Sequence, residues 1–181
     1  MALIRPARLD DGAEAIAVLR QSITELCVED HHGDPAILAD WLSNKTLPTF
    51  EAWIGNDETL LRVAEREANI IGVAAATRSG EILLNFVAPT ARFDGVSSAL
   101  LEHLETELFA SGLTHLSLWS TQTAHRFYAS RGWVDSGNPV MEGGTMSFPM
   151  QKTATRSAYR VKERFTAPTS SSLMPSINVE I

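Results

Sequence analysis

The segment Glu81–Val87 constrains the fold of this chain more than any other. Five of its seven residues are apolar, which is too many for a strand with one face in solvent, and Pro89 ends the run. We therefore expect a strand at the centre of a sheet. A helix with an apolar period follows from Gly95 to Gly112, and another strand follows at His115–Trp119. A strand, a helix and a strand in this order predict a right-handed parallel crossover.

The rest of the chain predicts a mixed α/β domain over residues 1–152. Before the central strand we expect a strand at 3–8, a helix opened by a capping box of Asp11 and Glu14, a turn at 29–35, a helix at about 35–43, and a hairpin of strands at 59–67 and 69–77. After the crossover we expect a helix at about 123–131 and an antiparallel pair at 133–135 and 145–151. Residues 153–181 read as a weakly ordered tail, although Tyr159, Val161 and Phe165 alternate as in a strand.

The composition is that of a globular protein, with 44% hydrophobic and 20% charged residues among 181. Cys27 is the only cysteine, which excludes an internal disulfide and a thiolate metal cluster. The formal net charge of −7 disfavours nucleic-acid binding, which needs a concentrated basic face. Since no apolar run reaches the roughly 18 residues of a spanning helix, we expect a cytoplasmic protein with neither a membrane nor a nucleic acid as partner.

Arg92 and Gly95 stand between the central strand and its helix, where an anion site is expected. A helix start presents unpaired N–H groups and a partial positive charge, and a glycine there lets a phosphate approach the backbone. Arg92 can add a charge-assisted contact. An Arg-x-x-Gly turn alone is more often only a loop and a cap, but in this setting it favours a cofactor that carries a pyrophosphate.

A second pattern strengthens this interpretation and carries a family resemblance. The two patterns are Val87-x-Pro89 with Arg92-x-x-Gly95-x-Ser97, and Ala124-x-x-Phe127-Tyr128-x-x-x-Gly132-Trp133. Together they resemble the GNAT N-acetyltransferase superfamily over residues 3 to about 151. Ser97 departs from the family's Gly or Ala, and Thr121 departs from an asparagine that often contacts pantetheine. The resemblance implies a GNAT-like acyl-CoA N-acyltransferase fold, a mixed α/β sheet with splayed central strands and flanking helices.

The resemblance also implies acetyl-CoA as cosubstrate, with its phosphates on the loop and helix start and its pantetheine arm between the central strands. A backbone N–H around Phe86 to Ala88 would face the thioester carbonyl, and the Thr121 hydroxyl would replace part of the asparagine's bonding. The residues assigned to the cofactor are Phe86, Val87, Ala88, Arg92, Phe93, Asp94, Gly95, Val96, Ser97, Ser98, Thr121, Ala124 and Phe127.

Two residues are the catalytic candidates that the resemblance implies. Tyr128 matches the tyrosine that donates a proton to the departing thiolate, although a lone tyrosine on an amphipathic helix is more often a packing residue. Glu81 stands eleven residues before Arg92, the spacing of the catalytic glutamate in histone-acetylating members, which makes it the candidate general base. The alternative for Glu81 is a solvated carboxylate at a strand start.

The resemblance implies that the connection between the first two helices shapes the acceptor pocket. Asp30 and His31 are its candidates, together with Asn85, which we expect on the same strand face as Glu81. His32 and Asp34 also lie in this connection, but adjacent histidines seldom bind one ion and we expect no metal. Solvation of an exposed loop is the alternative for this cluster.

The sequence therefore predicts an N-acetyltransferase that moves an acetyl group from acetyl-CoA directly to a primary amine of a small molecule. Two alternatives stay open: a CoA-binding regulatory module of the same fold without catalysis, and a protein or peptide N-acetyltransferase. The acidic net charge points weakly to a cationic acceptor. A homodimer is compatible with the resemblance, and the sequence leaves the oligomeric state open.

Overall fold

The structure, a computed structural model, describes residues 2–154. Its elements are β1 (Leu3–Pro6), η1 (Leu9–Asp11), α1 (Gly12–Leu26), α2 (Val28–His31), α3 (Pro35–Leu42), α4 (Leu47–Ile54), β2 (Thr59–Arg66), β3 (Asn69–Thr77), β4 (Glu81–Val87), η2 (Pro89–Ala91), α5 (Val96–Ala110), β5 (His115–Thr121), α6 (Gln122–Ala129), β6 (Val134–Asp135), β7 (Val140–Glu142) and β8 (Thr145–Thr153). Residues 155–181 of the predicted tail, which include the alternating Tyr159, Val161 and Phe165, lie outside the described part of the chain.

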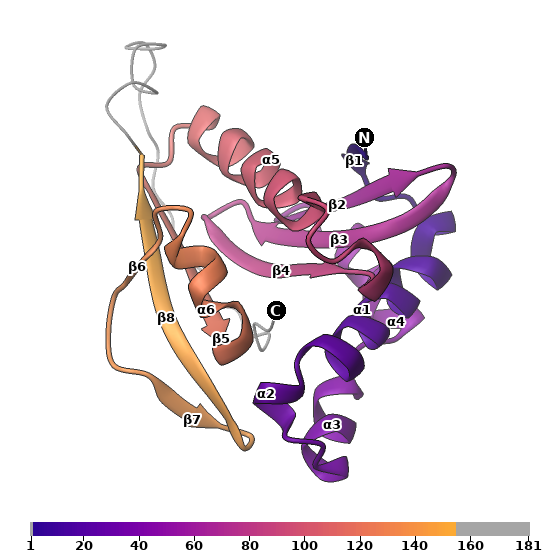
Figure 1. The fold of residues 1–181 in the computed structure, drawn as a ribbon. Coiled ribbons are helices and arrows are strands. Elements are labelled where there is room, and N and C mark those ends of the chain that lie inside the picture. Colours follow the sequence, from indigo (N-terminus) through magenta and orange to yellow (C-terminus); the bar gives the residue numbers. More distant parts are fainter. Residues whose placement is uncertain (1, 155–181) are drawn as a thin grey trace.

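The strands form one mixed sheet in the order β1-β2-β3-β4-β5-β8-β6, with β7 paired to β8 (Figure 1). All neighbours are antiparallel except β4 and β5, which are parallel and are joined by α5. The predicted mixed α/β class, the parallel crossover and the central place of the Glu81–Val87 strand are confirmed.

The two central strands pair only at their beginnings. Glu81 lies beside Ser117 and Ile82 lies beside Leu118, and no further pairs join β4 to β5. Beyond this point β4 continues along β3, while β5 continues along β8 up to Thr121. Figure 1 shows the two strands diverging, so the sheet opens at their carboxyl ends.

A β-bulge interrupts β4 within its apolar run. Ala75 of β3 lies opposite Leu84 and Ala76 lies opposite Ile82, so Leu83 has no partner in the register. Because side chains alternate in strict period two, the extra residue reverses the faces beyond it. Asn85 therefore shares its face with Ile82 and not with Glu81, so the expectation that Asn85 and Glu81 lie on one face is wrong.

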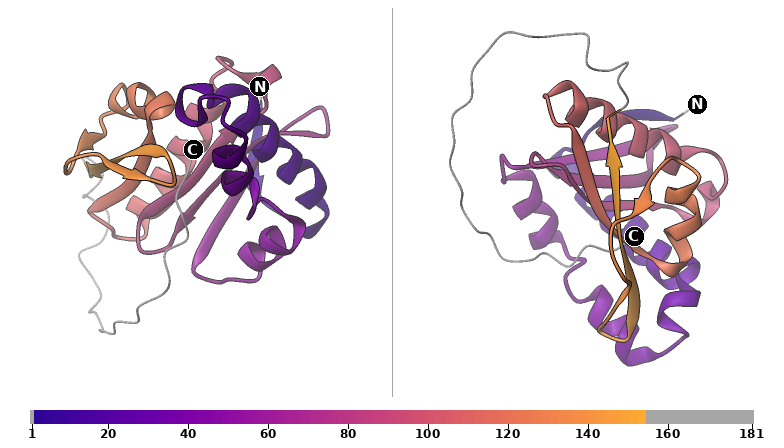
Figure 2. Two further views of the ribbon diagram at one scale, coloured as in Figure 1. Left: turned by 90° about the horizontal axis from the view of Figure 1, so that it is seen from below. Right: turned by 90° about the vertical axis from the view of Figure 1, so that its left-hand side faces the viewer.

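Helices cover both faces of the β1–β4 part of the sheet. Figures 1 and 2 place α5 on one face and α1 with α4 on the other. Gly72 of β3 allows α5 to pack closely, because an added Cβ would meet the Leu100 side chain at 2.9 Å and the Val96 side chain at 3.0 Å. Residues Gly72, Ala74 and Ala76 thus mark the face of β3 that α5 covers.

Several local predictions were wrong. The Asp11 carboxylate accepts from the backbone N–H of Arg8 and from Arg5, while Glu14 accepts from the N–H of Ile70, so these two residues do not form a capping box. The α2 helix occupies the start of the segment that was predicted as a turn, and α4 and β7 were not predicted. The other predicted helices and strands are present, with ends displaced by a few residues.

Candidate active site

The first turn of α5 has the properties of an anion site. Gly95 precedes it with φ of 79°, no side chain caps the helix, and an added Cβ at Gly95 would have no atom within 4 Å. The first backbone N–H of the helix that is hydrogen-bonded to the backbone belongs to Ala99, which donates to Gly95 O. The N–H groups of Val96, Ser97 and Ser98 are therefore open to an anion, as a helix start requires.

Charged groups fix the loop before α5. The Arg66 guanidinium pairs with the Asp94 carboxylate at 3.0 Å, which fastens the loop to β2 and compensates the negative charge of Asp94. The Arg92 guanidinium lies 4.7 Å from the centre of the Phe93 ring. Both Arg92 and Phe93 are exposed, and Phe93 has φ of 66°, a conformation that non-glycine residues seldom adopt.

Arg131 adds a positive charge that the sequence patterns did not reveal. Its guanidinium donates to the hydroxyl of Ser98 in the first turn of α5 and lies 3.9 Å from the centre of the Phe127 ring. Arg131 comes from the end of α6, so it joins the helix after β5 to the helix after β4. A sequence signal was lacking because an arginine near a helix end is ordinary.

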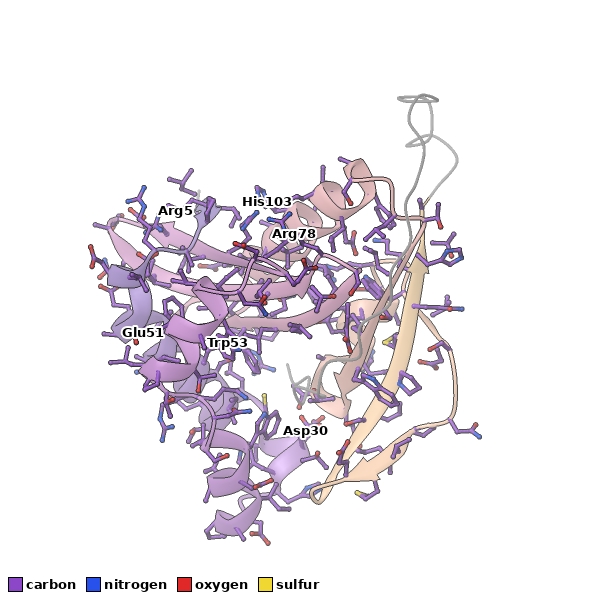
Figure 3. All side chains as sticks on the ribbon, turned by 180° about the vertical axis from the view of Figure 1, so that it is seen from behind. Arg5, Asp30, Glu51, Trp53, Arg78 and His103 are labelled. Atoms are coloured by element: carbon purple, nitrogen blue, oxygen red, sulfur yellow. The ribbon has the colours of Figure 1, made fainter. Side chains whose placement is uncertain are left out.

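The start of α6 is capped by the protein itself. The Asp30 carboxylate accepts from the N–H of Gln122 at 2.8 Å and from that of Thr123 at 3.4 Å, and the Thr121 hydroxyl accepts from Ala124 N–H at 3.3 Å. Figure 3 shows Asp30 on its helix at the opening between the two parts of the sheet. Of the two helices that follow the diverging strands, α6 is capped by side chains and α5 is not, which favours α5 as the place for an anion.

This capping changes the interpretation of Asp30 and Thr121. Both side chains are buried and both have their acceptor oxygens directed at α6. Burial raises the pKa of Asp30, and the hydrogen bonds from Thr123 and Gln122 oppose that rise. Asp30 therefore has a structural role that its position in a connection did not indicate.

The segment Phe86–Ala88 offers one donor toward the opening. The Ala88 N–H donates to Ile71 O at 2.9 Å, so it is engaged within the β3–β4 pair. Since hydrogen-bonded pairs alternate along an antiparallel ladder, the N–H of Phe86 also faces β3, and that of Val87 faces the β5 side. The backbone N–H of Val87 is therefore the candidate donor to a carbonyl oxygen.

Tyr128 lies on α6 and is completely buried. Its hydroxyl has no hydrogen-bond partner within residues 2–154, and a buried hydroxyl without a partner costs free energy. Burial raises the pKa of the phenol far above its ordinary value, and the nearby Asn85 amide opposes that rise. The phenol therefore stays protonated at neutral pH and retains an unused donor, which suits a general acid.

Asn85 faces α5. Its Nδ2 donates to the carbonyl oxygen of Ser97 at 3.2 Å, its Oδ1 has no partner in the described part of the chain, and its side chain is 3% exposed. The predicted acceptor-binding residue thus lies on the helix side of β4, where it approaches Tyr128 without reaching hydrogen-bond geometry.

Glu81 lies at the closed end of the opening, beside Ser117 of β5. It is half-buried, and burial raises the pKa of its carboxyl group. Its face is opposite to that of Asn85, so it belongs to the side of β4 that α1 covers. A carboxylate with a raised pKa is better matched to accepting a proton near neutral pH than an exposed one.

The imidazole ring of His31 provides a further buried hydrogen-bond donor. Its Nδ1 accepts from the N–H of Gly33 at 3.0 Å, which leaves the proton on Nε2. That Nε2 is buried and has no partner among the described residues. His31 is thus arranged to donate to an acceptor atom of a bound molecule.

Between residues 2 and 154 no three His, Cys, Asp or Glu side chains come together as a metal site. None of the helices described is both long and apolar enough to span a bilayer.

Comparison with known proteins agrees with this geometry. Residues 30–154 match the family described as "Acetyltransferase (GNAT) domain". No curated protein matches the chain in sequence.

Solved structures share the fold at low sequence identity. A GCN5-related N-acetyltransferase from Rhodopseudomonas palustris matches with a TM-score of 0.75 and 23% identity, covering 85% of this chain and 96% of that one. The PaiA N-acetyltransferase from Thermoplasma acidophilum, solved with coenzyme A, matches with 0.71 and 18%, covering 85% and 99%. A ribosomal-protein-alanine N-acetyltransferase from Brucella melitensis matches with 0.67 and 22%, covering 84% and 99%.

Proposed function

The chain belongs to the GNAT acetyltransferase family, and on this premise we propose that it acetylates a primary amine of a small molecule directly from acetyl-CoA. The observation that carries the proposal is the Tyr128 hydroxyl, which is buried and has no partner among residues 2–154, on the helix that directly follows β5. If this residue served packing alone, phenylalanine would give a more stable fold, because burying the tyrosine hydroxyl costs desolvation free energy that no hydrogen bond compensates.

The cofactor's phosphates have a suitable place at the start of α5. The open N–H groups of the first turn, Arg92 and Arg131 supply donors and positive charge there. The pantetheine arm would then run into the opening between the strands, toward Val87. When bound, acetyl-CoA supplies the activated acetyl group, and the protein supplies the donors and the proton transfers around it.

Three groups divide the work of acetyl transfer. Glu81 accepts the proton that the amine must lose, directly or through a water. The Val87 N–H donates to the thioester carbonyl oxygen as negative charge develops on it. Tyr128 donates its proton to the sulfur as the carbon–sulfur bond breaks. Each role uses a group described above, and none requires an acetylated side chain.

The β7–β8 turn favours a small acceptor over a peptide. Gly143 and Gly144 lie against Asp40 and Ile37 of α3, and an added Cβ at Gly144 would lie 2.7 Å from the Ile37 side chain. Figure 1 shows this turn beside α2 and α3. An extended polypeptide would have to pass this contact, whereas a small amine would not.

The test combines acetyl-CoA binding with thiol release over a panel of acceptors. Calorimetry should show binding of acetyl-CoA, and thiol release should be faster with small amines than with peptides that carry free N-termini. Turnover of peptides alone would favour the protein acetyltransferase. Binding without any turnover would favour the regulatory module, and the absence of binding would exclude both.

The cofactor site has its own control. Arg92→Ala combined with Gly95→Asp should weaken acetyl-CoA binding, because charge is lost and a carboxylate enters the anion site. Gly112→Ala is the matched control, since Gly112 also has positive φ and open space around it but lies at the other end of α5. Equal affinities in both variants would mean that the phosphates bind elsewhere.

The cytoplasmic location and the homodimer stay predictions. Light scattering would measure the oligomeric state.

A further inference from the structure

Two buried polar side chains lie on the side of the sheet that α5 covers. The Asn85 amide donates to Ser97 O of α5, and the Tyr128 ring lies 5.9 Å from the ring of Trp133, which donates to Glu105 of α5. Asn85 comes from β4 and Tyr128 comes from α6, and both are more than nine-tenths buried. The Asn85 Oδ1 and the Tyr128 hydroxyl have no hydrogen-bond partner within residues 2–154. Buried polar groups without partners are uncommon in proteins, so a pair of them in one place calls for a function.

A hydrogen bond to α5 fixes the orientation of the Asn85 amide. Its Nδ2 donates to Ser97 O at 3.2 Å, so nitrogen and oxygen of the amide are distinguished by this bond. An amide nitrogen carries two protons, and only one is used by Ser97. The second is available to the phenol oxygen of Tyr128, which agrees with the opposing effect of Asn85 on the pKa of that phenol.

The β-bulge at Leu83 is what brings Asn85 to this position. Without the extra residue, Asn85 would lie on the same face of β4 as Glu81, the face that α1 covers. With it, Asn85 lies beneath the first turn of α5. Its amide therefore connects the helix that forms the anion site to the hydroxyl of Tyr128.

We propose that Asn85 is a positioning residue for Tyr128, an inference that rests on the proposed acetyl transfer. In the complex with acetyl-CoA, its second N–H donates to the phenol oxygen, which directs the O–H proton toward the departing sulfur. In the reaction a bond forms between the amine nitrogen and the acetyl carbon, and the carbon–sulfur bond breaks. The sulfur takes the Tyr128 proton, the amine proton goes to Glu81, and solvent exchange restores Tyr128 and Glu81.

A double-mutant cycle of Asn85→Leu and Tyr128→Phe tests this coupling. Leucine branches at Cγ as asparagine does and removes the donor, although its side chain is larger. Thermal unfolding verifies that each variant is folded, and Asn85→Ala serves as a second variant. Asn56→Leu is the control, because Asn56 is exposed in the turn between α4 and β2. Labelled acetyl-CoA allows slow turnover to be measured in all proteins.

The expected result is a strongly non-additive cycle. Asn85→Leu should lower kcat about tenfold when Tyr128 is present and should change it less than twofold in the Tyr128→Phe protein, with KM for acetyl-CoA nearly constant. A merely structural role of Asn85 would lower kcat by the same factor in both backgrounds. That outcome, with an active wild type, overturns the inference and leaves the function intact. An inactive wild type overturns the function and the inference with it.

Discussion

At the scale of single residues, the site is made of groups whose ordinary hydrogen bonds are incomplete. The Tyr128 hydroxyl and the His31 Nε2 are buried without partners in the described chain, and Glu81 is half-buried at the closed end of the opening. In each case the protein bears a desolvation cost that a bound reactant can relieve. Such costs are tolerated where function requires them, so the same residues should show opposite effects on stability and on activity.

Tyr128→Phe should separate these two effects. Turnover should fall roughly a hundredfold, because a general acid contributes about 10² to 10⁴ in rate, while affinity for acetyl-CoA should stay nearly constant. The melting temperature should be equal or higher, since the buried unpartnered hydroxyl is removed without leaving a large cavity. Thiol-release kinetics and thermal unfolding measure the two quantities. Unchanged turnover would remove Tyr128 from the mechanism.

Glu81 should determine the acidic limb of the pH profile. Burial raises the pKa of its carboxyl group, so kcat/KM should begin to rise above the pH range of an ordinary glutamate as the base ionises. Glu81→Gln should lower kcat/KM and abolish this limb.

The stability of the same variant has a predicted sign. Because the folded state binds the Glu81 proton more tightly than the unfolded state, wild-type stability decreases as the pH rises from the ordinary glutamate range through the raised pKa. Glu81→Gln should lack this decrease. A mutant that keeps the acidic limb, or that is less stable than the wild type above it, would contradict the assignment.

At the scale of elements, two helices that follow two diverging strands differ in how their N-termini are satisfied. The start of α6 is capped by Asp30 and Thr121, whereas the start of α5 is left open behind Gly95. The difference is long-range, because Asp30 comes from α2, about ninety residues earlier in the chain. The capped start of α6 connects the two parts of the sheet, and the open start of α5 suits the proposed anion site.

Asp30→Ala should therefore destabilise the protein by about 1–2 kcal/mol, the usual cost of losing a cap. Asp30→Asn should cost less, since one oxygen still accepts and the buried charge is gone. Glu29→Gln is the control, because this neighbouring acid is exposed. Chemical denaturation measures all three. If Asp30→Ala lost activity at full stability, Asp30 would instead contact the acceptor, as the sequence suggested.

The sequence predicted elements whose pattern is local and missed those that depend on distant partners. The apolar run at 81–87 and the periodic helix after Gly95 were recognisable because burial alone explains them. The bulge at Leu83 was not, since it appears only in the register with β3. Thr46 before Leu47-Pro48 is a local start signal for α4.

The residues of the candidate site show the same difference between local patterns and long-range contacts. Arg92, Gly95 and Tyr128 could be named as candidates because they stand in fixed local patterns, whereas the contacts of Asp30 and Arg131 depend on the fold. Asn85 illustrates both cases. Its place on the central strand was predicted. Because of the bulge at Leu83, however, its side chain lies on the α5 face of the sheet and not on the face of Glu81.

At the scale of the whole molecule, the sheet consists of two parts with few backbone links. The strands β1 to β4 form one part and β5, β6, β7 and β8 form the other, and only two residue pairs of β4 and β5 join them. Contacts of Asp30 with α6 and of Arg131 with α5 supplement this link. A cofactor placed in the opening would touch both parts, so its binding should stabilise their connection more than either part alone.

Amide hydrogen exchange with and without CoA tests this expectation. Exchange should slow at the ends of β4 and β5 and in the first turns of α5 and α6, which border the opening, because binding suppresses the separation of the two parts. Amides of the β1–β2 pair, which lies at the far edge of the sheet, should change little beyond the global stabilisation of roughly 2.7 kcal/mol expected at a hundredfold excess of CoA over its Kd. The variant Arg92→Ala with Gly95→Asp should abolish the slowing at equal CoA concentration. Uniform slowing across the sheet would show that the molecule opens as one unit and that the cofactor does not act as a bridge.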